Sequence, residues 1–382
     1  MLTRCIIVEV RDHLRACNVY ILLKEKIQKS DIFQISVKAS LILLTKIADK
    51  TTVSQKIKVT TCSLIPCSLS NLNMHSNYVC FRLLTEPNNA VSGSFASEVL
   101  PLVNLHFKNN EFVFIPMLQK GKSYDIHCKC CSNMVSVSSV TFQRFLPLPS
   151  GFLEFEDYFC HAHGQQNNLQ SAPLCKSCDC LYGSYYFLIK PHLLKVSSAS
   201  VIKCDRCLSW IGTLNKDFAK LWSCTVSFGA VTTTSQPLED FLNVMKESLE
   251  GMPASAGKVL IECVVSDSNT HYILLWALDK FLNVHCNLNG KYSAVSESVT
   301  NSTVTIVAET SLQTMHTMKV LYKYQECASD CVGLWQNDKN VHTVDVAKQM
   351  FIAGLQHLMK QTEYIPEPYK IVEDFFVAYI EL

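Results

Sequence analysis

Two short cysteine motifs decide how the middle of this chain folds: Cys128-Lys-Cys-Cys131 and Cys204-Asp-Arg-Cys207. In a Cys-x-x-Cys turn both sulfur atoms point to the same side, so one pair supplies half of a tetrahedral zinc site. Two such pairs complete a four-thiolate shell. The residues therefore predict a structural Zn²⁺ ion bound by Cys128, Cys131, Cys204 and Cys207.

The two motifs lie far apart in the sequence, which leaves alternatives open. The separation from Cys131 to Cys204 exceeds that of a usual zinc ribbon, so the residues between them would have to form an insertion. Strand-like runs follow each pair, at 134–140 and 208–211, as a ribbon requires. Two unrelated sets of buried thiols are the alternative, and Cys130 could replace one ligand of the first pair.

The cysteine count argues against disulfide pairing throughout the chain. There are 19 cysteines in 382 residues, and an odd number cannot be fully paired. The segment Met1–Val8 holds only a short apolar run, whereas a secretory signal needs a longer one. In a reducing compartment clustered thiols are more often metal ligands or catalysts than disulfides. We therefore expect a cytoplasmic protein, with the nucleus as a further location.

Composition disfavours several functional classes. Lys and Arg number 34 against 33 Asp and Glu, so the net charge is +1 and no basic field supports direct nucleic-acid binding. No run of apolar residues is long enough for a spanning helix, so we expect no membrane insertion. Glycine-rich phosphate loops and the common hydrolase motifs are missing from the sequence, so no small-molecule active site is predicted.

Short strands separated by turn residues fill the first part of the chain. This spacing is typical of a sandwich or barrel, so we predict a β-sandwich-like domain over residues 1–124. The strands are expected at 5–10, 18–23, 59–62, 78–83, 102–107 and 112–115.

The rest of the chain divides into two further regions. Residues 125–234 form the cysteine-rich, zinc-ribbon-like region, with a strand at 185–189. In 235–382 Ser235 can cap a helix whose first turn contains Pro237 and which ends near Gly251. A second helix is expected at 344–360, and strands at 259–265, 272–277, 283–286, 303–307, 318–322 and 375–380. The predicted fold is α+β and mainly β, with two helices beside a C-terminal antiparallel sheet.

The pair Cys160-His161 lies in an inserted loop of the cysteine-rich region. A thiol beside an imidazole can act as nucleophile and base, but adjacent residues on an extended chain point in opposite directions. Cys160 could instead bind a metal, in this chain or in a partner. A half-buried cysteine beside a surface histidine remains the plain alternative.

Segments spread along nearly the whole chain resemble, in order, the HECT-like, E2-binding E3 ubiquitin-protein ligase family. The strongest likeness is Leu146-Pro-Leu-Pro-Ser-Gly151 followed by Cys160-His161, and both Cys-x-x-Cys pairs are family features. The other matching segments are Thr3–Arg11, Asp179-Cys180, Gly183–Leu188, Tyr272–Trp276, Lys319–Tyr322, Leu334-Trp335 and Val341-His342.

The resemblance implies a ligase that binds ubiquitin-conjugating enzymes, accepts ubiquitin on a cysteine as a thioester and passes it to protein substrates. Thiolates are good nucleophiles near neutral pH, which suits this exchange. The family associates the conjugating enzyme with the start of the first C-terminal helix, here 236–246. Phe241 and Leu242 are the expected contacts, although both also fit the core face of that helix.

The sequence departs from the HECT pattern at the acceptor. A HECT-type ligase carries its acceptor cysteine near the C-terminus, but this chain has no cysteine after Cys331. Cys327 and Cys331 are left as candidate acceptors, on a loop expected between a strand and a helix.

Relatives in the same family are linked to pre-mRNA 3′-end processing, which implies an alternative without catalysis. The segment with Pro147, Pro149, Ser150 and Gly151 resembles a peptide that enters the active site of a metallo-β-lactamase-type cleavage endonuclease. Cys160 and His161 would then meet the partner's zinc, where the thiolate of Cys160 would displace the attacking water and inhibit hydrolysis. A third possibility is a zinc-stapled interaction scaffold that has no activity.

Overall fold

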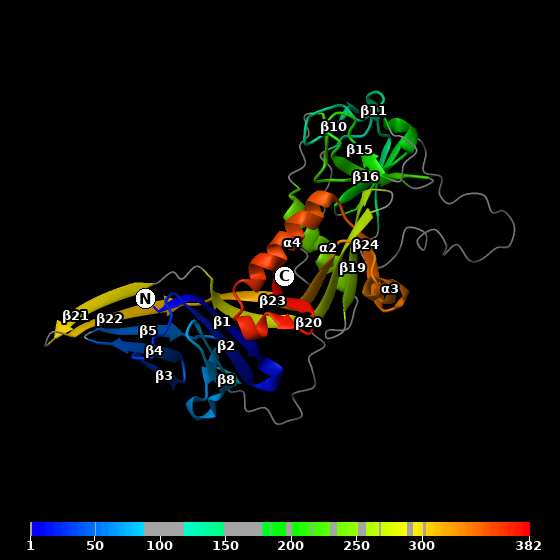
Figure 1. Cartoon of the computed structure of the whole chain (residues 1–382). Coiled ribbons are helices and arrows are strands. Elements are labelled where there is room, and N and C mark those ends of the chain that lie inside the picture. Colours follow the sequence, from blue (N-terminus) through cyan, green and yellow to red (C-terminus); the bar gives the residue numbers. More distant parts are fainter. Residues whose placement is uncertain are drawn as a thin grey trace. The chain divides into compact units, whose positions relative to one another are not determined.

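The computed structural model divides into two compact units (Figure 1). Unit 1 comprises Met1–Phe107, Leu278–Leu321 and Leu358–Leu382, and unit 2 comprises Lys108–Ala277 and Tyr322–His357. The three-domain division at 124/125 and 234/235 stays a prediction. The structure describes residues 2–49, 51–87, 118–148, 178–183, 185–195, 201–214, 217–229, 235–250, 257–266, 269–288, 293–300 and 303–382.

The first sheet of unit 1 combines strands from both ends of the chain. Its order is β25-β26-β23-β20-β1-β2-β8-β6, and β7 pairs with β8. Antiparallel pairing joins β1 to both β2 and β20. The strands are β1 (Thr3–Arg11), β2 (Ala16–Leu23), β6 (Cys62–Leu64), β7 (Ser70–Met74), β8 (Tyr78–Pro87), β20 (Asn269–Asn287), β23 (Gln313–Gln325), β25 (Ile371–Val372) and β26 (Phe375–Glu381).

The second sheet of unit 1 has the order β21-β22-β5-β4-β3. Its strands are β3 (Ile32–Lys38), β4 (Leu41–Ala48), β5 (Thr51–Lys58), β21 (Ala294–Thr300) and β22 (Thr303–Ser311). Every second side chain of β4 is buried where Ile42 and Leu44 face the core, as the period of a strand requires. These side chains share one apolar core with Ile6, Val19 and Phe81 of the first sheet.

Unit 2 contains a six-stranded sheet with the order β12-β13-β14-β17-β16-β15, two small ribbons and the pairing of β19 with β20 and β24. Its further strands are β9 (Ser123–Tyr124), β10 (Ile126–Cys128), β11 (Val140–Thr141), β12 (Arg144–Pro147), β13 (Asp179–Tyr182), β14 (Tyr186–Ile189), β15 (Val201–Lys203), β16 (Trp210–Leu214), β17 (Ala219–Trp222), β18 (Val226–Phe228), β19 (Lys258–Ser266) and β24 (Val341–Asp345).

Within the described ranges the helices are α2 (Pro237–Glu250), α3 (Asp330–Asn337) and α4 (Lys348–Thr362). Short 3₁₀ turns occur at Asp12–Leu14, Pro66–Ser68, Pro191–Leu193 and Glu367–Tyr369. None of the helices in the described residues is long and apolar enough to cross a membrane. The predicted α+β, mainly β fold class is confirmed.

Both predicted helices are present, at α2 and α4, but several local predictions were wrong. The strand expected at 59–62 does not form, because β5 ends at Lys58 and β6 begins at Cys62. The strands expected at 272–277 and 283–286 are parts of the single strand β20. The run at 134–140 makes isolated bridges at Met134 and Ser136 instead of a continuous strand. The strands expected at 102–107 and 112–115 lie outside the described residues.

Candidate metal centre

The four cysteines of the two Cys-x-x-Cys motifs converge in unit 2. Cys128 ends β10 and Cys204 follows β15, and all four sulfur atoms lie within 4.8 Å of one another. The Sγ–Sγ distance is 3.7 Å between Cys128 and Cys207 and 3.5 Å between Cys131 and Cys204. A tetrahedral zinc site with Zn–S bonds of about 2.3 Å requires sulfur atoms about 3.8 Å apart. The sulfur cluster therefore has the size that a zinc ion needs.

The two motifs adopt the same backbone turn. The N–H of Ser132 donates to the carbonyl of Cys128, and the N–H of Leu208 donates to the carbonyl of Cys204. Each motif closes with a second bond, from Cys128 N–H to the Asn133 carbonyl and from Cys204 N–H to the Ser209 carbonyl. Ser132 and Leu208 both have a φ of 58°. Two equivalent turns that face each other across one sulfur cluster fit the arrangement of a structural zinc site.

Backbone N–H groups in these turns point at the sulfur atoms. Burial alone would raise the pKa of Cys204, but N–H donors from Cys207 and Arg206 and the neighbouring thiols lower it to about 7. At Cys128 burial prevails and raises the pKa to about 12, although N–H groups of Cys130 and Cys131 oppose it. A divalent cation would replace the thiol protons and favour four thiolates.

The cysteine cluster belongs to the interior of unit 2. Cys128 and Cys204 are buried within its main apolar core, and the half-buried Cys131 and Cys207 pack against that core. The same core includes Phe187 and Phe228, whose rings meet edge to face at 5.0 Å between centroids. Because ligands and core are continuous, an ion here would hold β10 and β15 in place.

A polar network connects the first cysteine turn with the start of α2. The Nζ of Lys129 donates to the Ser223 carbonyl at 3.0 Å. The next residue, Cys224, is buried and its thiol donates to the Asp240 carboxylate, which also accepts a hydrogen bond from Ser235. Burial raises the pKa of Asp240 to about 6, against the hydrogen bonds that lower it. A change in the first turn would therefore reach the N-terminal end of α2.

A sequence model of the HECT-like ubiquitin-conjugating enzyme (E2)-binding family matches residues 9–377. The chain belongs to this family. A human protein named as an E3 ubiquitin-protein ligase is 25% identical over 301 residues, which cover 67% of this chain and 72% of that protein. No solved structure matches this chain. The resemblance noted in the sequence is thus confirmed, and it assigns the chain an E2-binding role in ubiquitin transfer.

The structure places the two expected E2 contacts of this family member in different environments. Phe241 is fully buried, and a Cβ on Gly354 of α4 would lie only 2.4 Å from its ring. Its ring therefore packs in the core against α4, and its part in E2 binding stays a prediction. Leu242 is half-buried, and its part in E2 binding stays a prediction.

The two candidate acceptors lie close together in the sequence of unit 2. Cys327 is exposed and precedes α3, whereas Cys331 is half-buried in the first turn of that helix, which Ser329 caps through its Oγ. The prediction of a loop was therefore wrong for Cys331. A helix of eight residues gave too short an apolar pattern to be recognised.

The residues of the endonuclease hypothesis lie almost entirely outside the described part of the chain. Pro149, Ser150, Gly151, Cys160 and His161 are not described, so this alternative stays a prediction. Pro147 is described and ends β12, which pairs in parallel with β13.

Asp240 is a site residue that sequence reasoning missed. An acidic residue in the first turn of a helix is common and gives no special signal. Its partner Cys224 comes from β17–β18, so only the folded chain brings the two together. Lys129, inside the first Cys-x-x-Cys motif, donates to the Ser223 carbonyl, a contact that the sequence likewise does not indicate.

Proposed function

We propose that this protein is an E3 ubiquitin-protein ligase that takes ubiquitin from a conjugating enzyme onto one of its own cysteines and passes it to protein substrates. The family match over residues 9–377 is the observation that carries the proposal. The E3 ligase name of the human relative agrees with it. Conjugating enzyme, ubiquitin and substrate are then the partners of this chain.

Burial removes most described cysteines as acceptors. An acceptor must be reachable and must form a thiolate near neutral pH. Burial raises the pKa of Cys286 to about 11, and it raises the pKa of five other thiols to about 12: Cys5, Cys17, Cys80, Cys224 and Cys263. The four clustered cysteines are reserved for the ion. The six buried thiols with a raised pKa stay protonated near neutral pH and are inaccessible to a conjugating enzyme.

Cys331 and Cys327 are better placed for the transfer. Cys331 is half-buried in the first turn of α3. Cys327 is exposed four residues earlier. Both lie a short distance before α4 in the sequence, in a part of the chain that the family match covers.

The proposed transfer has two balanced steps. The thiolate attacks the carbonyl carbon of the thioester between ubiquitin and the conjugating enzyme, and the conjugating enzyme's thiolate leaves. A substrate lysine amine then attacks the new thioester, so that an isopeptide bond forms, the amine loses a proton and the acceptor thiolate is released. Zn²⁺ at the four-cysteine cluster would take no part in these steps, because all four ligands come from the protein and leave no open position.

Single-round transfer tests this proposal. Conjugating enzymes loaded with ubiquitin are mixed with the full chain, and adducts are separated with and without reductant. We expect a ubiquitin adduct that reductant removes. Cys331→Ala, or the double variant Cys331→Ala with Cys327→Ala, should abolish this adduct. Cys67→Ala should still form it. Cys67 is the matched control because it is exposed but lies in unit 1. The proposal is refuted if none of the conjugating enzymes gives an adduct, or if all three variants form the adduct equally.

A further inference from the structure

The core-facing side of the second sheet of unit 1 continues past the part that the first sheet covers. Side chains two apart on a strand share a face, so Val304, Ile306, Ala308 and Thr310 of β22 point to the same side. Ala308 and Thr310 are buried, and the hydroxyl of Thr310 accepts a hydrogen bond from Gln55. This side of β22 is therefore the core face at one end.

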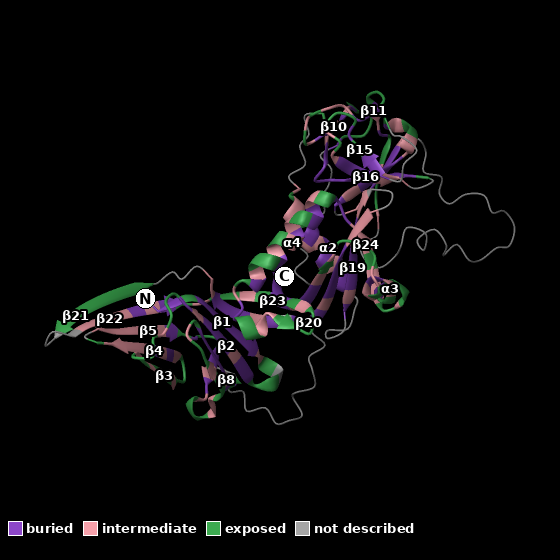
Figure 2. Cartoon of the chain, viewed as in Figure 1, coloured by how far each residue is buried: buried purple, intermediate pink, exposed green. Residues whose placement is uncertain are grey.

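On that face, the exposure of the side chains increases along β22 from Thr310 toward Val304, and it increases again from β22 to β21. Ile306 and Val304 are half-buried, and their partners on β21 are Glu297 and Val299. Val299 is 66% exposed and Val295, paired with Ala308, is 54% exposed. Figure 2 shows β21 exposed along its length. A strip of apolar side chains thus extends over β22 and β21 into solvent.

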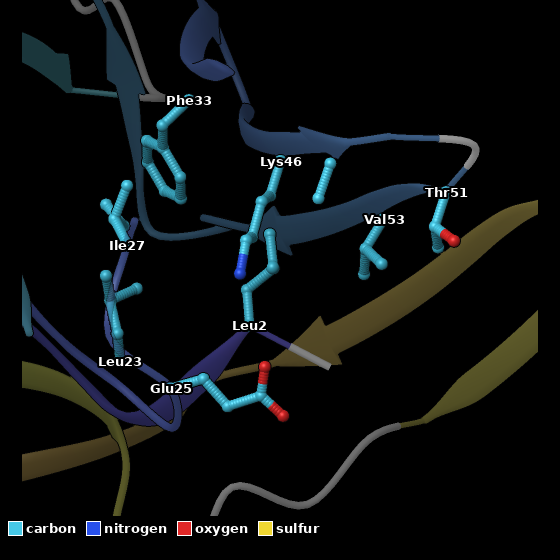
Figure 3. A pocket seen from close by; sticks show the side chains of 9 residues that line it. Leu2, Leu23, Glu25, Ile27, Phe33, Lys46, Thr51 and Val53 are labelled. Carbon is cyan, nitrogen blue, oxygen red and sulfur yellow. The ribbon is translucent and has the colours of Figure 1, made fainter. Parts of the chain in front are cut away.

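A pocket adjoins this strip on the same face of the sheet, on the side of β22 that is away from β21. The β5 partners of Ile306 and Val304 are Val53 and Thr51, and both line a cavity of about 180 Å³ (Figure 3). Leu2, Leu23 and Phe33 supply further apolar walls. A cavity of roughly 150 Å³ can hold a benzene ring, so this pocket has room for one aromatic or branched aliphatic side chain.

Two carboxylates lie at the strip and in its pocket. Glu297 lies between Val295 and Val299 on the exposed face, and Glu25 lines the pocket. Lys46, which also lines the pocket, is paired with Asp31 at 3.2 Å. The carboxylates of Glu297 and Glu25 thus lie at the apolar strip and in its pocket, where they favour a basic side chain of a partner.

We infer that the apolar strip of Val295, Val299, Val304 and Ile306, together with the adjoining pocket, binds an amphipathic helix with a basic flank on a partner protein. Neighbouring strands lie about 4.8 Å apart, so β5, β22 and β21 together span about 10 Å. A helix with its side chains is about 10–12 Å wide. Lying along the strands, it places one apolar side chain in the pocket and a basic side chain at Glu297. This surface belongs to unit 1 and does not depend on the proposed transferase activity.

A designed helix measures this interaction directly. A fluorescent Leu/Lys amphipathic peptide of about 14 residues, roughly 21 Å long, is titrated onto the full chain and followed by anisotropy. A Leu/Glu peptide of the same length is the charge control. We expect the Leu/Lys peptide to bind more tightly, and Glu297→Lys to weaken it roughly three- to tenfold. Hydrogen exchange should slow in β5 and β22 when the peptide binds.

Two variants on one strand separate this surface from general effects. Ser298→Lys places a lysine on the exposed opposite face of β21, and it should leave binding nearly unchanged. Val299→Ser should weaken binding of the Leu/Lys peptide without any change of charge. Equal binding of both peptides, or equal effects of Glu297→Lys and Ser298→Lys, overturns the inference. Self-association that Glu297→Lys abolishes would assign the strip to a second copy and overturn it as well.

Discussion

Replacing Gly354 with alanine probes how closely α4 packs on α2. An added Cβ would lie 2.4 Å from Cδ2 and Cε2 of Phe241 and 2.5 Å from its Cγ. Carbon atoms in ordinary contact are about 3.5–4.0 Å apart, so the ring would have to retreat by about 1 Å. Phe241 is fully buried, which leaves its ring no free space for this movement.

The expected magnitude follows from two opposing effects. Alanine in the middle of a helix is favoured over glycine by about 1 kcal/mol. Overpacking a well-filled core costs about 1–3 kcal/mol, and three ring atoms in close contact put Gly354→Ala near the upper end. We therefore expect the free energy of unfolding to fall by about 1–2 kcal/mol.

Urea unfolding followed by fluorescence measures the change. Gly333→Ala is the matched control, because Gly333 lies in α3 and nothing is within 4 Å of its added Cβ. That variant should gain up to about 1 kcal/mol. The double variant Gly354→Ala with Phe241→Leu should recover part of the loss. If Gly354→Ala proves as stable as Gly333→Ala, the two helices are not packed as described.

Three further predictions concern the cysteine cluster and two buried carboxylates. Cys204→Ser should abolish the binding of zinc and melt the surrounding core of unit 2, measured by metal analysis and near-ultraviolet circular dichroism. Burial raises the pKa of Asp240 from 3.8 to about 6, so the folded state favours the protonated carboxyl. The free energy of unfolding should therefore fall by about 3 kcal/mol as the pH rises from about 4 to about 6. Asp240→Asn should remove that fall in urea unfolding at several pH values. Glu9 is buried, which alone would raise its pKa, yet Lys319 at 2.6 Å and three hydrogen bonds lower it. The stabilisation of the fold by ionised Glu9 is therefore present above pH about 4.5 and is lost in acid. Glu9→Gln should lower the free energy of unfolding by about 3 kcal/mol at pH 7 and by less below pH 4.

Each of these variants has a control in the same chain. Cys130→Ser removes an exposed thiol of the first turn and should retain zinc, and equal metal loss would show that Cys130 is a ligand. Glu239→Gln, on an exposed neighbour of Asp240, should leave the pH profile as it is. Glu309→Gln breaks a half-exposed pair with Lys58 and should cost less than about 1 kcal/mol. A cost for Glu9→Gln no larger than this would refute the buried network.

The cysteine cluster and both long helices could be predicted from local signals. Two Cys-x-x-Cys pairs fix the ligand types, and the apolar spacing from Leu238 to Leu249 defines one face of α2. In β20, by contrast, Asp279 and Lys280 interrupt the apolar pattern, so the sequence suggested two strands. Lys280 is buried inside a single strand, which only the tertiary structure could reveal.

Contacts between residues far apart in the sequence could not be predicted. The Thr51–Lys58 strand pairs in parallel with Thr303–Ser311, far along the chain, and no local pattern indicates that pairing. Glu9 lies in an apolar strand, where a lone carboxylate suggests the solvent face. Its partners Lys319 and Tyr379 lie more than 300 residues away. Chemistry that depends on such contacts is visible only after folding.

The equivalent cysteine turns are separated by 73 positions between Cys131 and Cys204. At a ribosomal rate of about 5–20 residues per second, on the order of 4–15 seconds pass between the emergence of the first turn and that of the second. During this interval the nascent chain presents Cys128, Cys130 and Cys131 as unligated thiols, open to oxidation or mispairing. With the proposed zinc ion at this cluster, biogenesis would depend on the zinc supply and the thiol-reducing capacity of the cell at the time of translation.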